Sequence, residues 1–184
     1  MKYNITVQNN LLEIEIKQPS KNDIKALVEL NAKWQLAALN GSTKQGFLSG
    51  VFNELFFNEL IQNNAIMAAY YNNNIVAYML TANHSNEGLL QVHKDEVEKL
   101  KTENKIEKNA TVAVGIQTAV ETAFHGSGLI VLMRNEFRAL LKNRFQYLFT
   151  TIAKTNERSF ASATKYGWQV VGDDEHHYFL ILNV

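Results

Sequence analysis

VETAFHGSGLI, at residues 120–130, joins a strand-like stretch to a helix-like one. Residues 111–120 are rich in β-branched side chains, and apolar residues recur at helical spacing over residues 129–141. Gly126 and Gly128 let the chain turn tightly between the two. Such a turn aims several unpaired backbone N–H groups at the point where the positive end of the helix dipole lies. The stretch therefore predicts a phosphate-binding site.

A second motif lies at residues 156–168, with the sequence NERSFASATKYGW. It predicts a short helix that ends at Gly167, because glycine is frequent just after a helix C-terminus. Each motif has an ordinary explanation when it is taken alone: a Gly-x-Gly pair also occurs in plain turns, and many helices end at a glycine. What the motifs indicate depends on the elements around them.

Apolar periodicity predicts an alternation of strands and helices along the chain. The expected strands are residues 11–17, 65–71, 75–82, 111–120, 145–153, 168–171 and 177–182, and the expected helices are residues 24–39, 47–61, 129–141 and 157–166. Residues 92–100 also fit a short charged helix inside a polar segment. Without that helix, the order is β-α-α-β-β-β-α-β-α-β-β.

This order predicts an α/β (α+β) fold with a central mixed sheet and helices on both faces. The strand-helix-strand unit from Thr111 to Ala153 requires a parallel strand pair with a right-handed crossover. The hairpins on either side, one of which turns at Asn72 to Asn74, are antiparallel. A length of 184 residues suits one domain, residues 1–184.

Composition excludes several classes of function. The chain has 18 basic and 18 acidic residues, so a net charge of zero argues against nucleic-acid binding and against an electrostatic membrane anchor. The absence of cysteine excludes disulfides, thiolate metal sites and cysteine nucleophiles. No apolar run has membrane-spanning length, and the N-terminus lacks the apolar core of a signal peptide, so we expect a cytoplasmic protein.

We also expect no metal site. His176 and His177 are neighbours in an expected strand, so their side chains point to opposite faces and cannot hold one ion together. No carboxylate cluster has the spacing of metal ligands.

The element order and the two motifs resemble the GCN5-related N-acetyltransferases over nearly the whole chain. The pyrophosphate pattern of that family is Gln or Arg, any two residues, Gly, any residue, then Gly or Ala. The positions that match it here run in the order His125, Gly126, Ser127, Gly128, Leu129, Ile130. His125 replaces Gln or Arg, and Ile130 replaces the last small residue. The resemblance implies that this turn binds pyrophosphate through backbone amides.

The same resemblance implies that the preceding strand carries a bulge and that its backbone, at Thr118 and Val120, binds the pantetheine arm of acetyl-coenzyme A. In the later motif Asn156 matches the family residue that bonds this arm. Ala163 stands where many members have a tyrosine that protonates the departing thiolate. Tyr166, three residues further on, is either a substitute proton donor or an ordinary core aromatic. His125 fits a phosphate contact and a solvated loop residue equally.

The residue that takes the proton from the acceptor amine has three candidates. Glu121 directly follows the expected pantetheine strand, and His84 and Glu87 follow the strand at residues 75–82. Glu121 also fits a solvated residue beside a turn. The charge-dense segment at residues 94–108 fits a solvated insertion or a lid over the acceptor.

The resemblance implies an acetyl-coenzyme A-dependent N-acetyltransferase whose acceptor is a primary amine, on a small molecule or at a peptide N-terminus. The amine attacks the thioester directly, and a backbone N–H of the bulged strand near Val120 polarises the carbonyl. Two alternatives stay open: a non-catalytic acyl-coenzyme A-binding or interaction module, and a structural protein that no longer binds the cofactor. The phenylalanines Phe52, Phe56 and Phe57 fit an acceptor wall or a homodimer surface.

Overall fold

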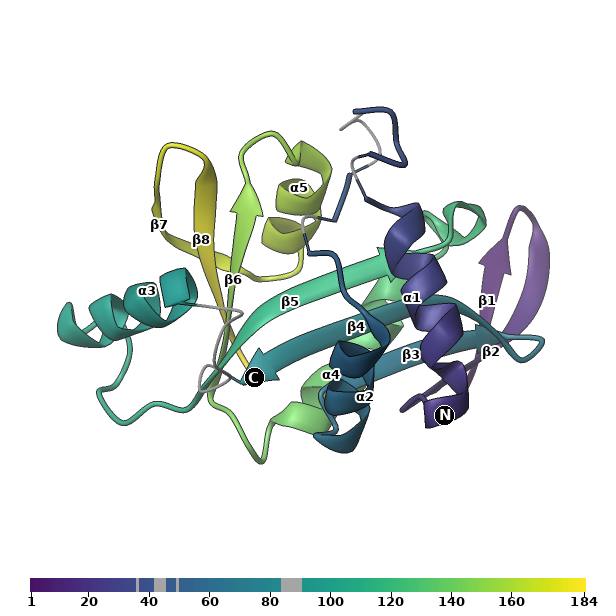
Figure 1. Ribbon diagram of the computed structural model, residues 1–184, viewed down its shortest axis with the longest axis horizontal. Helices are drawn as coiled ribbons and strands as arrows, with labels where there is room; N and C mark the ends of the chain where they lie inside the picture. The colour runs from purple at the N-terminus through teal and green to yellow at the C-terminus, as the bar shows by residue number, and fades with distance from the viewer. Residues whose placement is uncertain (36, 42–45, 49, 84–90) are drawn as a thin grey trace. The chain divides into compact units, whose positions relative to one another are not determined.

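The structure is a computed structural model in which residues 1–35, 37–41, 46–48, 50–83 and 91–184 are described, with backbone alone at residues 83, 91, 92 and 116. Figure 1 labels the strands and helices. The strands are β1 Lys2–Val7, β2 Asn10–Lys17, β3 Ile66–Tyr71, β4 Asn74–Asn83, β5 Val112–Val120, β6 Tyr147–Ala153, β7 Gln169–Asp173 and β8 His177–Asn183. The helices are α1 Ile24–Lys33, α2 Glu54–Gln62, α3 Gln91–Thr102, α4 Leu129–Leu141 and α5 Glu157–Lys165, with short 3-10 turns at Lys21–Asp23 and Thr122–Phe124.

The strands form a mixed sheet in the order β1-β2-β3-β4-β5-β6-β8-β7. The ladders β1–β2, β2–β3, β3–β4, β6–β8 and β7–β8 are antiparallel. The β5–β6 ladder is parallel, as the crossover through α4 requires. The predicted mixed sheet is confirmed.

The backbone packs as two compact units. Unit 1 comprises residues 1–40, 48–80 and 117–140, and unit 2 comprises residues 41–47, 81–116 and 141–184. Strands β4 and β5 run through both units, so each unit has its own part of the β4–β5 pair. The single-domain organisation stays a prediction.

In unit 1, helices cover both faces of the strands. Leu30 of α1 and Phe57 of α2 share a buried cluster with Tyr78 and Leu80 of β4. Figure 1 shows α1 and α2 in front of these strands and α4 behind them. On that second side, Glu136 of α4 accepts a hydrogen bond from the Tyr3 hydroxyl of β1.

In unit 2, α3 and α5 also lie on opposite faces. Val97 of α3 packs in a buried cluster with Phe149 of β6 and Phe179 of β8. Phe160 of α5 stacks on Tyr178, with ring centroids 4.3 Å apart. Because Tyr178 and Phe179 are neighbours in a strand, their side chains point to opposite faces. The predicted helices on both faces are confirmed within each unit.

Three features at the N-terminal end differ from expectation, and the first is that α1 ends at Lys33 rather than at residue 39. Strand β1 was not expected, although Ile5 and Val7 alternate with polar residues, because its six residues give only a short pattern. It pairs with β2 through a tight turn in which Gln8 and Asn9 have φ of 47° and 67°. The chain therefore begins with a hairpin rather than a single strand.

The second expected helix begins late. It starts at Glu54 rather than Phe47, and the side chain of its N-cap, Asn53, accepts a hydrogen bond from the amide of Phe56. The apolar spacing of the helix expected at residues 47–61 predicts that Val51 and Leu55 point inward, but they are 77% and 78% exposed. Apolar spacing alone does not show which face of a short helix has a partner. The charged segment at residues 92–100 is the helix α3.

Candidate functional site

Strand β5 carries a bulge. Val112 and Val114 pack in the cluster of α3, whereas Ala119 packs in the cluster of α1 and α2. On β4, Leu80 and Ala82 join these two clusters while remaining two residues apart, as on one face of a regular strand. On β5, Val114 and Ala119 are an odd number of residues apart, which on a regular strand would put their side chains on opposite faces. One extra residue therefore lies between them.

The extra residue lies at Gly115, whose φ of +71° is left-handed. A glycine in this conformation is typical of a bulge, which bends the strand and re-aims the side chains that follow. Strand β5 thus has the bulge that the family resemblance implies, five residues before Val120.

The β5–β6 ladder ends beside this bulge. Its pairs are Val112–Tyr147, Ala113–Leu148 and Val114–Phe149, and among the described residues it extends no further. Strand β6 continues to Ala153 and keeps its pairing with β8. Backbone groups of β5 beyond Val114 can therefore bond an extended ligand in the manner of an added strand. Thr118 is half-buried and Val120 is buried, and their contact with a pantetheine arm stays a prediction.

The glycine turn, residues 125–128, leads from β5 into α4. Gly126 and Gly128 have φ of 78° and 81°, and a Cβ built on either would meet no atom within 4 Å. Within the described part of the chain, the amides of Gly126, Gly128 and Ile130 make no backbone hydrogen bond. Open space beside the two glycines, together with amides that lack backbone partners at a helix N-terminus, fits a phosphate group.

The side chains of the turn point into the protein and build the turn itself. The Nε2 atom of His125 lies 3.1 Å from the carbonyl oxygen of Val120, and its ring lies 5.4 Å from the ring of Trp34. Ser127 Oγ donates to the carbonyl of Phe124 at 2.7 Å and accepts from the amide of Leu129 at 3.3 Å. His125 is therefore half-buried and bonded within the turn rather than fully solvated, and its contact with a phosphate stays a prediction.

Asn156 is the N-cap of α5 and is only 7% exposed. Its Oδ1 accepts from the amide of Ser159 at 3.3 Å, and its Nδ2 donates to the carbonyl of Phe47 at 3.0 Å. Both ends of the amide thus have partners in unit 2. Its expected bond to the pantetheine arm stays a prediction.

The residue at the position of the usual tyrosine is buried. Ala163 is 5% exposed, and its carbonyl accepts from the amides of Tyr166 and Trp168 at 3.0 and 3.2 Å. Tyr166 is the C-cap residue of α5. Its role as a proton donor stays a prediction.

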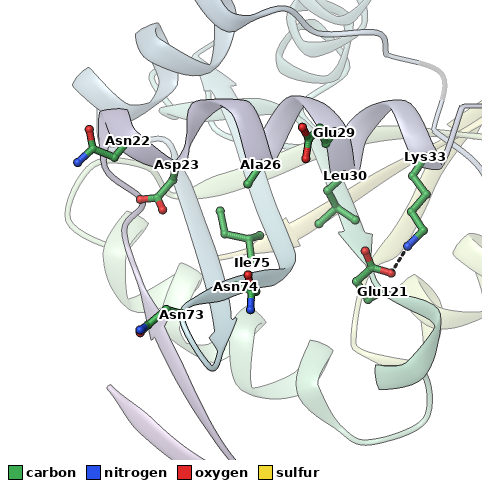
Figure 2. A pocket seen from close by; sticks show the side chains of 10 residues that line it. All are labelled: Asn22, Asp23, Ala26, Glu29, Leu30, Lys33, Asn73, Asn74, Ile75 and Glu121. Atoms are coloured by element: carbon green, nitrogen blue, oxygen red, sulfur yellow. Dashed lines mark hydrogen bonds and ion pairs between the residues drawn. The ribbon is translucent and has the colours of Figure 1, made fainter.

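Glu121 lies at an open hollow of about 490 Å³ in unit 1, between α1 and the β3–β4 turn. Its Oε2 lies 2.5 Å from Lys33 Nζ, and Figure 2 shows the two side chains pointing toward one another. The carboxylate therefore has a cationic partner. The other two candidate bases, His84 and Glu87, lie outside the described residues.

Unit 1 contains an amide network that no sequence pattern indicates, formed by Asn31, Gln35, Tyr78, Gln117 and the carbonyl of Gly50. The side-chain amides of Asn31, Gln35 and Gln117 donate to that single carbonyl oxygen at 3.0, 2.9 and 3.1 Å. The Tyr78 hydroxyl donates to Gln117 Oε1 at 2.8 Å. Burial raises the pKa of the Tyr78 phenol, so it stays a donor at neutral pH. The members come from four separate segments, so no local pattern reveals them.

Among the residues that the structure describes, no three His, Asp or Glu side chains are placed to hold a metal ion. In that same part of the chain, no helix has the length and apolar character needed to cross a bilayer.

No family model matches the chain, and no curated protein sequence matches it closely enough to be counted. Solved structures do match. A GNAT-family acetyltransferase from Listeria monocytogenes is 17% identical, with a TM-score of 0.71 over 99% of this chain and 100% of that one. The acetyltransferase yncA from Salmonella typhimurium, solved with acetyl-CoA, is 12% identical, with a TM-score of 0.60 over 92% of this chain and 93% of that one.

A third match is Naa50 from Arabidopsis thaliana, in complex with the bisubstrate analogue CoA-Ac-MVNAL. It is 12% identical, with a TM-score of 0.61 over 93% of this chain and 99% of that one. These identities are too low to transfer an activity, but the likeness extends along nearly the whole length of each chain. The chain therefore has the fold of the GCN5-related N-acetyltransferases.

Proposed function

We propose that this protein is an acetyl-coenzyme A-dependent acetyltransferase that acts on a primary amine. The observation that carries the proposal is the course of β5, which bends at Gly115, leaves its ladder with β6, and ends in a glycine turn with free amides. The amides of Gly126, Gly128 and Ile130 would hold the pyrophosphate, and the β5 backbone from Gly115 to Val120 would hold the arm.

The bound thioester would supply an activated acetyl group. A backbone N–H of β5 near the bulge, rather than near Val120, is best placed to polarise its carbonyl, because the arm runs back along β5 from the turn. The strand backbone and the turn hold the reactants in register, so the amine attacks without a covalent intermediate on the enzyme. The chain has no cysteine that could form one.

The amide network of unit 1 is uncharged, so nothing in it favours a polycation over a neutral molecule that carries one amine. A primary amine, on a small molecule or at a peptide N-terminus, is the acceptor class we propose.

One observation favours a second candidate, a non-catalytic acyl-coenzyme A-binding module. The usual thiolate-protonating tyrosine is absent, and the alanine in its place, Ala163, is buried. On this alternative the same turn binds the cofactor but no acceptor reacts.

Two measurements on the purified protein separate these outcomes. Calorimetric titration with acetyl-coenzyme A tests binding, and release of free thiol with a panel of primary amines tests transfer. We expect both binding and amine-dependent thiol release. Binding without thiol release for any amine would support the non-catalytic binding module instead. No binding at all would overturn both candidates.

A further inference from the structure

His93 lies on the face of β6 in unit 2. It is the third residue of α3, and its Nε2 lies 3.2 Å from Thr151 Oγ1. Its ring meets the ring of Phe149 edge-on, with centroids 6.0 Å apart and an interplanar angle of 84°. The imidazole is thus held by a hydroxyl on one side and an aromatic ring on another, and it is partly buried.

This place coincides with the end of the β5–β6 ladder. Among the described residues, Phe149 is the last β6 residue that pairs with β5, and Thr151 is two residues further along on the same face. In the proposed function the arm lies along β5, so its acyl end is expected where β6 leaves β5 in unit 2. His93 contacts Thr151, the β6 residue just past that place.

We propose that His93 accepts the proton of the incoming ammonium group, an inference that rests on the proposed acetyl transfer. With Nε2–H donated to Thr151, the lone pair of Nδ1 takes one proton from the ammonium, and the free amine attacks the carbonyl. The new C–N bond forms and the C–S bond breaks. The imidazolium then protonates the departing thiolate, and the acylated nitrogen loses its second proton to solvent. One side chain thereby does the work of both the unassigned base and the missing tyrosine.

The surroundings of His93 keep the ring uncharged in the resting protein. Burial lowers its pKa, and the nearby His177 lowers it further. From β6 it faces the uncharged Phe149 and Thr151. His177 of β8 has Asp174 within 3.4 Å of its own Nδ1. The N-terminal end of α3 also disfavours an imidazolium in the first helical turn. The lone pair is therefore present at neutral pH.

The pH dependence of kcat/KM for the amine tests the proposal, with His93→Gln compared with the parent protein. Glutamine keeps a partner for Thr151 but cannot take a proton. The parent rate is expected to be flat from neutral pH up to the pKa of the amine. The variant is expected to lose about a hundredfold at pH 7, and the loss should shrink about tenfold per pH unit as more of the amine becomes free base.

A purely structural role would instead lower the rate by the same factor at every pH. His176→Gln is the matched control, since the His176 side chain is 74% exposed and should keep the parent profile. A second readout needs no turnover: an NMR titration of the histidine rings, with the His93 signal identified by its loss in His93→Gln. We expect the ring pKa of His93 to lie below its ordinary value and to change in Thr151→Val.

The outcomes separate this inference from the proposed function. If the parent acetylates amines and His93→Gln keeps the parent profile, or if the NMR titration shows a charged ring at pH 7, the role of His93 is overturned and acetyl transfer stands. If the parent binds acetyl-coenzyme A but acetylates no amine, the proposed function falls, and the role of His93 with it.

Discussion

In the glycine turn, the groups left without a backbone hydrogen bond among the described residues are the amides of Gly126, Gly128 and Ile130, and the side chains of His125 and Ser127 bond to backbone carbonyls nearby. In the amide network the arrangement is reversed: side chains of three residues converge on one backbone oxygen, that of Gly50. A site made of backbone can be recognised from a few adjacent residues, because only its turn must be specified. A site made of side chains depends on segments far apart in the sequence. Substitutions should therefore affect the two regions in different ways.

The largest effect is expected from Gly128→Val. Valine is disfavoured at a φ of 81°, and its side chain would fill the space in front of the free amides. The loss of one or two charge-assisted hydrogen bonds should weaken acetyl-coenzyme A binding by about 2–4 kcal/mol, measured by calorimetry. Gly41→Val is the matched control, because Gly41 has a φ of 75° and equally open space but lies outside the turn. Equal losses in both variants would mean that backbone strain, not the site, is being measured.

Asn31→Leu tests the side-chain site. Asn31 is 1% exposed and donates to the carbonyl of Gly50, while its Oδ1 accepts from the amide of Phe52. Buried partners left without a hydrogen bond should lower the free energy of unfolding by about 1–3 kcal/mol, measured by urea denaturation. The exposed Asn4 of β1 provides the control, and Asn4→Leu should change stability by less than about 0.5 kcal/mol. If Asn31→Leu is as harmless as the control, the network contributes nothing to the fold.

At Asn156 a side chain bonds to backbone groups at both of its ends: it caps a helix and it holds a backbone carbonyl. Asn156→Ala should lower the free energy of unfolding by about 1 kcal/mol through the lost cap, measured by thermal or urea unfolding. Asn156→Asp keeps the accepting oxygen for Ser159 but loses the donor to Phe47, so it separates the two contacts. A fall in acetyl-coenzyme A affinity with unchanged stability would instead support the pantetheine contact expected from the sequence.

The smallest effect is expected at the Lys33–Glu121 pair. Their side chains are 55% and 29% exposed, and such pairs contribute about 0.2–1 kcal/mol. Glu121→Gln should therefore leave stability nearly unchanged, and it should leave the pH profile of kcat/KM intact if His93 takes the proton. If Glu121→Gln instead lowers the rate at pH 7 and the loss shrinks as the pH rises, while His93→Gln keeps the parent profile, the role of base returns to Glu121.

The same contrast explains what the sequence could predict. The glycine turn, α4 and the β5–β6 crossover came from neighbouring residues whose spacing fixes their conformation, and all three are present. A bulge in this strand followed from the family resemblance. The alternation of side chains between the two faces of β5 locates it at Gly115. Strand β1 was missed because a six-residue alternation is weak evidence. Val51 and Leu55 were misplaced because periodicity shows that residues are apolar but not whether anything packs against them.

The candidate site was less predictable for a physical reason. Gln117 and Asn31 meet only because the bulge turns the β5 side chains that follow it to the other face of the strand. No local pattern encodes this long-range effect. The contact between His93 and Thr151 likewise joins two distant segments. Asn156 matches a motif in the sequence, but the motif does not show that both ends of its amide are already bonded within the fold.

Two kinds of glycine in this chain should differ in how they vary among relatives. At Gly126 and Gly128 the constraint is a backbone angle, which asparagine also tolerates, as Asn72 and Asn73 do at φ of 49° and 64°. At Gly50 the constraint is space: a Cβ there would lie 2.5 Å from the ring of Phe52, which stacks on Phe56 with centroids 4.1 Å apart. In an alignment of relatives, positions 126 and 128 should therefore alternate between glycine and asparagine independently, whereas positions 50 and 52 should change only as a pair.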